Sequence, residues 1–178
     1  MDKGILGEMW RMRIPGLIAI VLAGVLALSL GGTQPRAAGS DESPAAARAQ
    51  EDPDWSAAKA AIDKDDYEAA IPLLQKVVAR VADNADAYNY LGYAHSRLDR
   101  YDEALAYYQK ALAIDPKHRG ANEYLGELYL KLGDVAGAEQ RLKVLDRACW
   151  LGCEEYTELK KAIADFKATG RYTPHKDD

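Results

Sequence analysis

The two cysteines are the side chains in this sequence whose type and spacing could support chemistry. Cys149 and Cys153 are the only cysteines, and they flank Trp150-Leu151-Gly152. In an oxidising compartment two lone thiols four positions apart favour a disulfide, and Gly152 can supply the left-handed turn that brings them together. A disulfide across so short a loop is expected to contribute on the order of 2 kcal/mol or less.

Two other interpretations of the cysteines stay open. Reduced, the pair could act as a redox-active dithiol or hold a soft metal ion such as Cu(I), and the thiols could also remain free. The Cys-x-x-Cys spacing typical of redox motifs is absent, and no His or Met lies near the pair in the sequence. A structural disulfide between Cys149 and Cys153 is therefore the leading prediction, and thiol-redox or Cu(I) handling is its alternative.

The remaining polar residues predict no catalytic site, metal site or cofactor. The three histidines are scattered: we expect His95 in a half-buried core position, His118 in a turn and His175 in the C-terminal tail. The sequence has no Gly-rich phosphate loop, no Gly-x-Ser-x-Gly elbow and no His-Glu-x-x-His motif. We therefore expect a protein that is not an enzyme and binds no cofactor.

Charge and aromatic content indicate a protein partner. The formal charge is −5, and no run of Lys and Arg interleaves with aromatic residues, which argues against nucleic acid as a partner. The chain has 11 Tyr and 3 Trp but only 1 Phe. Tyrosine combines an apolar ring with a polar tip, so this composition suits half-buried contact surfaces.

The N-terminal segment has the pattern of an export signal. Lys3, Arg11 and Arg13 precede an uncharged apolar stretch over residues 14–30, and Ala37-Ala38-Gly39 offers a cleavage site. The alternative is an uncleaved membrane anchor, since the apolar stretch is close to the minimum length of a spanning helix. Both interpretations place the rest of the chain outside the cytoplasm, in the bacterial periplasm, either released or anchored to the inner membrane by residues 1–39.

Two segments are too polar to form a core. Residues 40–53 are small, polar and Pro-bearing, which predicts a flexible linker, and residues 170–178 predict a disordered tail. The folded domain is accordingly expected to span residues 54–169.

Between these segments the sequence repeats itself at one fixed spacing, a period of about 34 residues. Residues of similar size or polarity recur in six columns: Tyr67, Tyr101 and Val135; Ala70, Ala104 and Ala138; Ala58, Gly92 and Gly126; Ala57, Leu91 and Leu125; Leu74, Tyr108 and Leu142; Val77, Ala111 and Leu145. The small residues are expected where helices approach closely, and the large ones fill the seams between helices.

Helix boundaries are also marked in the sequence. Asp65 and Asp99 precede the second helix of their repeats and are expected as N-caps, with Asp65 and Glu68 spaced as a capping box. Pro72 lies inside a predicted helix, near its start and on its expected solvent side, and Pro116 is expected to end the second helix of the middle repeat.

The middle repeat, residues 87–116, closely resembles the tetratricopeptide-repeat family. The family pattern is met by Tyr88, Leu91, Gly92, Tyr101, Ala104, Tyr108, Ala111 and Pro116, with His95 in place of the usual Tyr. The third repeat, from Arg119 to about Gly152, resembles the family through Leu125, Gly126, Tyr129, Gly133 and Ala138. The first repeat, residues 51–84, is degenerate. The resemblance covers roughly residues 51–150.

The resemblance implies an all-α fold, a short solenoid of about three helix-turn-helix repeats. A further helix is predicted over residues 153–168, where Tyr156, Leu159, Ile163 and Phe166 lie on one face. We expect it to cap the open end of the solenoid. The alternative is a helix reserved for a partner.

The resemblance also implies a groove lined by the first helix of each repeat, where relatives bind peptides or extended segments. Matching positions place the following residues there: Trp55, Lys59 and Ile62; Asn89, Tyr93, Ser96 and Arg97; Glu123, Glu127, Leu130 and Lys131. Arg97 with Lys131 could hold a carboxylate. The two-asparagine clamp of chaperone-binding relatives is not reproduced, because Asn89 has no second Asn in register. The alternative is that these residues only face solvent.

The sequence therefore predicts an exported adaptor or assembly scaffold of the bacterial envelope, with a protein or peptide partner bound in the concave groove. It predicts contact with a membrane only through residues 1–39, and only if that segment is not cleaved. Self-assembly through exposed solenoid ends, giving a homo-oligomer, is a further possibility, because three repeats are close to the minimum for a stable array.

Overall fold

The structure, a computed structural model, describes residues 52–174, and within them the chain forms seven α-helices and no strand. The helices are α2 (Pro53–Ile62), α3 (Tyr67–Arg80), α4 (Ala85–Arg97), α5 (Tyr101–Ile114), α6 (Arg119–Lys131), α7 (Val135–Ala148) and α8 (Glu154–Thr169). The predicted all-α fold is confirmed.

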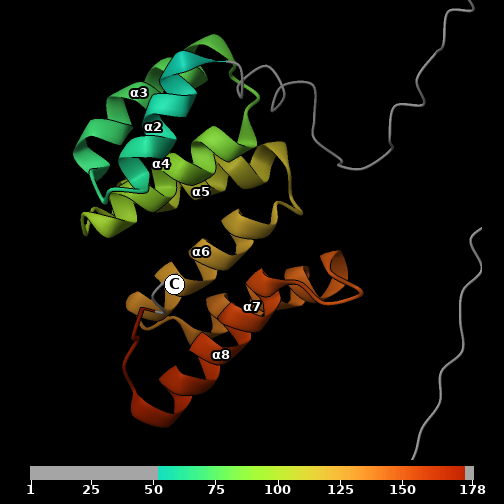
Figure 1. Cartoon of the computed structure of the whole chain (residues 1–178). Helices are drawn as coiled ribbons and strands as arrows, with labels where there is room; N and C mark the ends of the chain where they lie inside the picture. The colour runs from blue at the N-terminus through green and yellow to red at the C-terminus, as the bar shows by residue number, and fades with distance from the viewer. Residues whose placement is uncertain (1–51, 175–178) are drawn as a thin grey trace, which may run out of the picture. The chain divides into compact units, whose positions relative to one another are not determined.

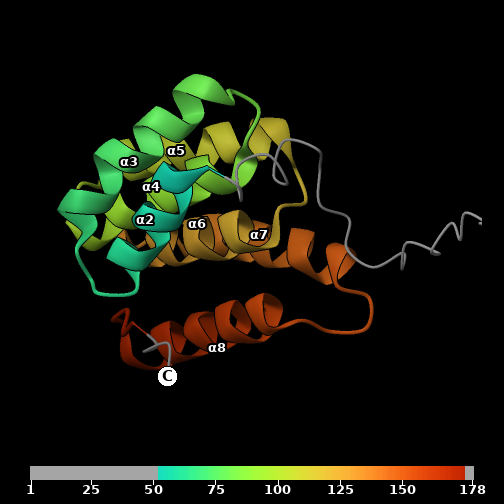
Figure 2. The ribbon, with the colours of Figure 1, turned by 45° about the horizontal axis from the view of Figure 1, so that its top comes forward.

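The helices pack as successive antiparallel pairs. α2 packs on α3, α4 on α5 and α6 on α7, and each pair packs on the next through α3 with α4 and α5 with α6. Figure 1 shows the pairs following one another from α2 and α3 to α7, and Figure 2 shows α8 lying along the last pair. α8 contacts both α6 and α7, so it covers the end of the last repeat as a capping helix.

The small-residue columns are buried as predicted. Ala70, Ala104 and Ala138 are all fully buried at the helix crossings. A Cβ atom on Gly92 or on Gly126 would lie within 2.7 Å of a side chain of a packed helix, so each glycine makes room for a neighbouring side chain. In the degenerate first repeat Ala57 is exposed, and Pro72 is also exposed, as expected for a proline tolerated inside a helix.

α8 continues the register of the preceding repeats. Leu159, Ala162 and Ile163, which are all buried, each lie one repeat period after Leu125, Leu128 and Tyr129 respectively. α8 is therefore the first helix of a fourth repeat that has no second helix among the described residues.

The predicted N-caps at Asp65 and Asp99 are wrong by one residue. The N-cap of α3 is Asp66, whose carboxylate accepts the backbone N–H of Ala69 at 3.1 Å, and no capping box forms between Asp65 and Glu68. α5 begins after Arg100, which makes no side-chain cap. Asp65 and Asp99 instead accept hydrogen bonds from the hydroxyls of tyrosines two positions later.

The physical reason is the turn between the two helices of each repeat. Asp65, Asp99 and Gly133 all have positive φ, at 57°, 57° and 80°, and they occupy the same position in successive repeats. In each turn the next N–H closes a Schellman hydrogen bond to a carbonyl five positions back. These bonds are Asp66 to Ala61 at 2.9 Å, Arg100 to His95 at 2.9 Å and Asp134 to Tyr129 at 2.7 Å.

The domain ends differ slightly from those expected. Asp52 caps α2 by accepting the N–H of Asp54 at 2.9 Å, and Pro53 is the first helical residue, so the last two residues of the predicted linker belong to the fold. Tyr172, in the predicted tail, packs on the apolar cluster around α8. The structure therefore describes residues 170–174 of the predicted tail, and Tyr172 among them contacts the domain.

Other predictions about the ends of the chain lie outside the described residues. These are the signal peptide or anchor over residues 1–39, most of the linker over residues 40–53, and the tail over residues 175–178. Within residues 52–174, no helix combines the length and apolar character that crossing a membrane requires.

Candidate binding groove

A cavity of about 810 Å³ opens along the first helices of the second and third repeats. Its walls come from α4, α6 and α8, from the α4–α5 and α6–α7 turns, from two tyrosines of α5, and from residues 170–174. The main lining side chains are Tyr93, Ser96, Arg97, Asp99, Tyr101, Tyr108, Glu123, Tyr124, Glu127, Leu130, Lys131, Glu158, Phe166, Arg171, Tyr172 and Pro174. The cavity has the size and the mixed polarity of a ligand site.

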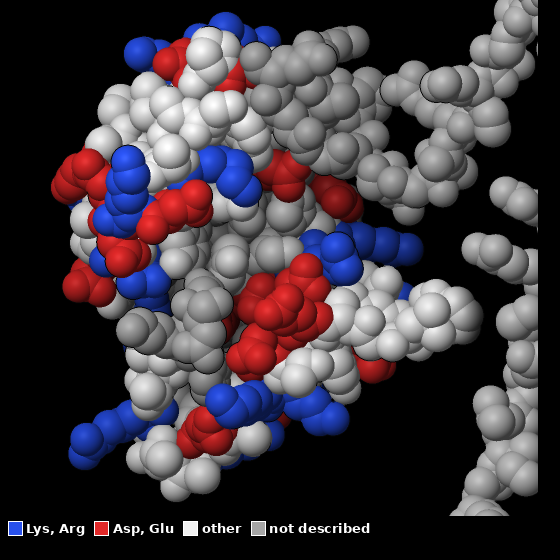
Figure 3. Space-filling model, viewed as in Figure 1, with Lys and Arg blue, Asp and Glu red and all other residues white. Residues whose placement is uncertain are grey.

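The lining carries more acidic than basic side chains. Asp99, Glu123, Glu127 and Glu158 are acidic, whereas Arg97 and Lys131 are the basic residues that the helices supply. On the face drawn in Figure 3, Lys and Arg side chains are likewise interspersed with acidic ones, which gather into a patch near the middle of the view. Among the described residues on that face, the basic side chains form no continuous surface of the kind that nucleic acid requires.

Lys131 lies at the centre of the groove contacts. Its ammonium donates a hydrogen bond to Ser96 Oγ at 3.0 Å, which ties α6 to α4. The ammonium also lies 5.9 Å from the ring centre of Tyr101 and 5.7 Å from that of Tyr172, within cation–π range. Burial lowers the pKa of Lys131, and the nearby Glu127 carboxylate opposes that effect.

Arg97 is held by two tyrosines at the other side of the groove. It donates a hydrogen bond to the Tyr93 hydroxyl at 2.8 Å, and its guanidinium lies 5.1 Å from the Tyr67 ring centre and 5.6 Å from that of Tyr93. A carboxylate oxygen of Asp65 lies 3.8 Å from a guanidinium nitrogen of Arg97. A carboxylate held between Arg97 and Lys131 would therefore compete with contacts that both cations already make.

The groove residues expected from the sequence fall into two sets. Those from the second and third repeats that line the cavity are Tyr93, Ser96, Arg97, Glu123, Glu127, Leu130 and Lys131. Trp55, Lys59, Ile62 and Asn89 do not line it.

The four residues that do not line the cavity contact other parts of the domain instead. Trp55 is buried edge-on to the Tyr90 ring at 5.4 Å, and Lys59 donates a hydrogen bond to the Tyr90 hydroxyl at 3.1 Å. Ile62 packs on the apolar cluster of the first repeat, and Asn89 is 5% exposed. The first repeat therefore adds none of its predicted residues to the cavity.

Tyr172 is a groove residue that sequence reasoning missed. It lies three residues after the end of α8 and is half-buried against the cluster that includes Leu130 and Ile163. Burial raises the pKa of the Tyr172 hydroxyl, and its hydrogen-bonded neighbour Glu127 raises it further. The one signal in the sequence was Gly170, which permits the chain to turn back after the predicted helix, with Tyr172 two positions later.

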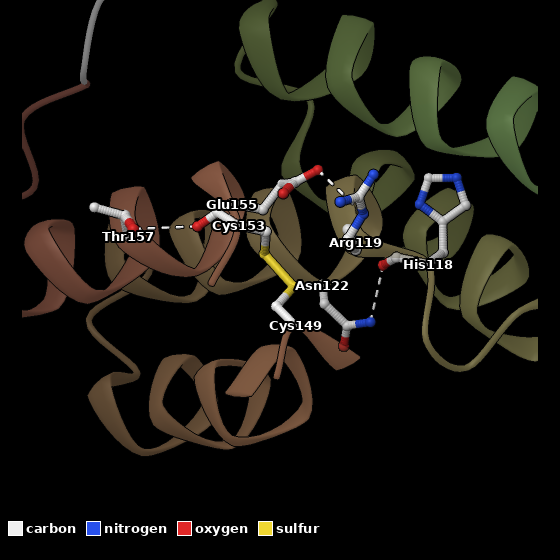
Figure 4. The surroundings of a disulfide bond; sticks show 7 residues. All are labelled: His118, Arg119, Asn122, Cys149, Cys153, Glu155 and Thr157. Atoms are coloured by element: carbon white, nitrogen blue, oxygen red, sulfur yellow. Dashed lines mark hydrogen bonds and ion pairs between the residues drawn. A yellow bond between two sulfur atoms is a disulfide. The ribbon is translucent and has the colours of Figure 1, made fainter. Parts of the chain in front are cut away.

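The structure joins Cys149 and Cys153 in a disulfide, with their Cα atoms 5.6 Å apart (Figure 4). Gly152 has φ of 86° and donates its N–H to the Cys149 carbonyl at 2.7 Å, which provides the expected left-handed turn. The turn leaves Trp150 and Leu151 exposed at its tip.

One acidic side chain lies beside the two sulfur atoms. Glu155 offers a carboxylate oxygen within 4.8 Å of both sulfurs, so the three side chains could hold a metal ion if the disulfide were reduced. The same carboxylate lies 3.5 Å from Arg119 Nε (Figure 4). As drawn, the S–S bond takes up both thiolates that a soft metal would need.

The two described histidines have structural contacts. His95 is 7% exposed, packs beside Tyr107, and has no hydrogen-bond partner on either ring nitrogen within the described part of the chain. Burial lowers its pKa. His118 is the N-cap of α6: Nδ1 accepts the Ala121 N–H at 3.1 Å, and Nε2 lies 2.9 Å from an Asp86 carboxylate oxygen.

Comparison with known proteins identifies the repeat. Two family models described as tetratricopeptide repeat match residues 56–119 and 97–148, which together span more than half of the chain. Tetratricopeptide repeat protein 1 of Schizosaccharomyces pombe is 27% identical over 108 residues, which cover 54% of this chain and 10% of the relative. Tetratricopeptide repeat protein 37 of Xenopus laevis is 29% identical over 124 residues, which cover 66% of this chain and 8% of the relative. The chain thus spans about a tenth or less of these relatives.

Solved structures show the same fold at low sequence identity. The complex of the TPR2B domain of yeast Sti1 with pHsp70 aligns with a TM-score of 0.55 and 20% identity, over 67% of this chain and 98% of that one. The Sgt2 TPR domain of Aspergillus fumigatus aligns with a TM-score of 0.56 and 19% identity, over 76% and 90%. A chain of the CopN–Scc3 complex aligns with a TM-score of 0.53 and 20% identity, over 64% and 66%.

Proposed function

Since the chain belongs to the tetratricopeptide-repeat family, we propose that it is a non-catalytic adaptor that binds an extended segment of another protein between α4, α6 and α8. The observation that carries this proposal is the cavity of about 810 Å³, lined by tyrosines and by charges of both signs. Tyrosine gives a large contact area at low entropic cost, and such residues dominate binding energy at protein interfaces.

Two of the structural neighbours support a protein ligand. One is a complex of a tetratricopeptide-repeat domain with pHsp70, and the other is a complex of CopN with Scc3. We do not propose a chaperone C-terminus as the ligand, because Asn89, the one residue that could belong to a two-asparagine carboxylate clamp, is buried and does not line the groove. The proposed ligand is an internal extended segment rather than a free C-terminal carboxylate.

The proposal includes an extracytoplasmic location, in the periplasm of a bacterium. It is supported by the basic and then apolar composition of residues 1–39 and by a disulfide, which persists in oxidising compartments. Fractionation of cells, with mass measurement of the mature N-terminus, distinguishes a cleaved signal from an inner-membrane anchor. Recovery of the intact chain in the cytoplasm would contradict both.

The binding proposal is tested by photo-crosslinking from the groove in whole cells. We would place p-benzoylphenylalanine at Leu132, which lines the cavity and is 51% exposed, and at Ile114, which is 39% exposed and lies outside the cavity. We expect a defined protein adduct from position 132 and not from 114, and we expect Lys131→Glu to abolish it. Adducts of equal yield at both positions, or adducts that persist with Lys131→Glu, would overturn the proposal.

Light scattering on the purified protein decides whether the crosslinked partner is a second copy. A monomer that still gives the adduct at position 132 establishes a different protein as the partner. A concentration-dependent dimer that yields only self-adducts would instead support self-assembly through the solenoid.

The alternative function, thiol-redox or Cu(I) handling, has one observation in its favour, the cluster of Cys149, Cys153 and Glu155. Thiol titration with and without reductant, followed by Cu(I) competition against a chromogenic chelator, tests it. Reversible reduction at a mild potential with stoichiometric Cu(I) uptake would favour this alternative. A disulfide that resists exchange and a protein that takes up no Cu(I) would exclude it.

A further inference from the structure

A hydrogen-bonded turn after α8 directs the chain back into the groove. Gly170 ends the helix with φ of 68° and donates its N–H to the Phe166 carbonyl at 2.7 Å. Thr169 Oγ1 accepts the Arg171 N–H at 3.2 Å, and its hydroxyl proton lies between the carbonyl oxygens of Asp165, at 2.8 Å, and Arg171, at 3.0 Å. These bonds fix the reversal and set the direction of the residues that follow.

The reversal brings Tyr172 into contact with three kinds of group in the groove: apolar side chains, an ammonium and a carboxylate. Its ring packs against the apolar cluster of α6, α7 and α8, and the ammonium of Lys131 lies 5.7 Å from the ring centre. Its hydroxyl is hydrogen-bonded to Glu127. Pro174, two residues further, also lines the cavity. An aromatic ring, a cation and a carboxylate are thus matched as they would be for a bound peptide.

We infer that residues 170–174 are an internal occupant of the groove, and that the segment which displaces them is an extended peptide carrying a tyrosine and no net negative charge. The inference rests on the proposed function, because it concerns the ligand and the regulation of the same groove. The protein's own segment shows which side chain the groove accepts between Lys131 and Glu127.

The charge of the lining defines the rest of the ligand. With residues 170–174 displaced, Arg97 and Lys131 face Asp99, Glu123, Glu127 and Glu158, so the groove has an excess of negative charge. The internal occupant itself contributes a positive charge through Arg171. A displacing segment that is neutral or basic around its tyrosine meets this field favourably, whereas an acidic one is repelled.

Internal occupancy weakens binding of any outside ligand by the fraction of time that the groove is open. A segment that covers the Lys131–Glu127 part of the groove for roughly 90–99% of the time would reduce the apparent affinity of a ligand for that part about 10- to 100-fold. The segment therefore keeps this part of the groove closed to weak ligands and opens it to a matched one.

The test uses full-length chains and a fluorescent peptide with the sequence of residues 168–178, followed by anisotropy. The compared chains are the unchanged protein, Tyr172→Ala, and Tyr156→Ala as a matched control. Tyr156 is also half-buried on the same apolar cluster but does not line the cavity. We expect Tyr172→Ala to bind the peptide at least 10-fold more tightly than the other two, and the same peptide with its tyrosine replaced by alanine to bind none of them.

Equal affinity for all three chains, or no binding even at millimolar peptide, would overturn the inference. Tyr172→Phe is a second variant that keeps the packing ring and removes only the hydroxyl; it should give an intermediate affinity, and thermal melts by circular dichroism verify that each variant folds. The proposed function fails separately: if crosslinking from position 132 still yields the Lys131-dependent adduct, the groove binds a partner even where residues 170–174 do not regulate it.

Discussion

A Cβ atom on Gly92 would lie 2.6 Å from two carbons of the Tyr108 ring, so the ring of Tyr108 fills the space above this glycine. Tyr108 is 1% exposed and contributes to the wall of the groove. The glycine of α4 thus sets both the packing of α5 and the position of a ring in the binding surface. Two positions of the family pattern, Gly92 and Tyr108, are therefore in direct contact with each other.

Replacing Gly92 by alanine is expected to destabilise the domain by about 1–3 kcal/mol, because a ring packed on all sides cannot move away from the added methyl group. Urea unfolding monitored by circular dichroism measures the loss. Gly120→Ala is the matched control, since its Cβ would come no closer than 3.2 Å to any side chain, the nearest atom being Asn89 Nδ2. An equal or larger loss for Gly120→Ala would contradict the argument from Tyr108.

Gly133→Ala is expected to cost about 1–2 kcal/mol for a different reason, the left-handed backbone that disfavours a Cβ atom. A Cβ at Gly133 meets no atom within 4 Å, so the cost arises from the positive φ of 80° alone. Gly133→Asn should cost less, because Asn tolerates this conformation better than Ala does. Thermal or urea unfolding of the two variants ranks them, and the reverse ranking would be inconsistent with a backbone origin.

Stability is expected to fall in mild acid because of His95. Burial lowers the pKa of His95 in the folded chain, whereas in the unfolded chain it titrates near 6.5. Above about pH 6.5 His95 is neutral in both states and its contribution to stability is complete. As the pH falls below 6.5, the unfolded chain takes up the proton first, so the free energy of unfolding decreases until the pH reaches the pKa of His95 in the folded chain.

The measurement for His95 is urea unfolding at pH 7.5 and pH 5.5. We expect the unchanged protein to be less stable at pH 5.5 than at pH 7.5. His95→Tyr should reduce this loss, because Tyr129 holds the same position in the next repeat and does not titrate in this range. The same pH dependence in both proteins would assign the effect to other groups.

Breaking the disulfide should have a small effect on stability. The loop between Cys149 and Cys153 is short, so its closure removes little entropy from the unfolded chain, and the double variant Cys149→Ser, Cys153→Ser should lose about 2 kcal/mol or less. Reductant should lower the free energy of unfolding of the unchanged protein by the same amount and leave that of the double variant unaffected. A much larger loss would indicate that the bond holds more than a local turn.

The cavity includes those predicted groove residues whose positions follow from the repeat, and it leaves out those that contacts with a neighbouring repeat engage. Ser96 and Lys131 could be placed because they occupy matching faces of consecutive first helices. Trp55 and Lys59 do not line the cavity, because Tyr90 of the next repeat engages both of them. In the degenerate first repeat the expected wall of the groove is instead packed against its neighbour.

The sequence by itself determined the repeat period, the fully buried Ala104 and the pairing of helices, because these depend on side-chain size at positions fixed by helix geometry. Only the tertiary structure decided that Asp99 is a left-handed turn residue rather than a cap, since one residue of register separates the two roles. It also decided that Tyr172 lies in the groove. That placement follows from a chain reversal at Gly170 and from contacts with α6, two helices earlier in the chain. The glycine permits the reversal, but no local pattern specifies the contacts with α6.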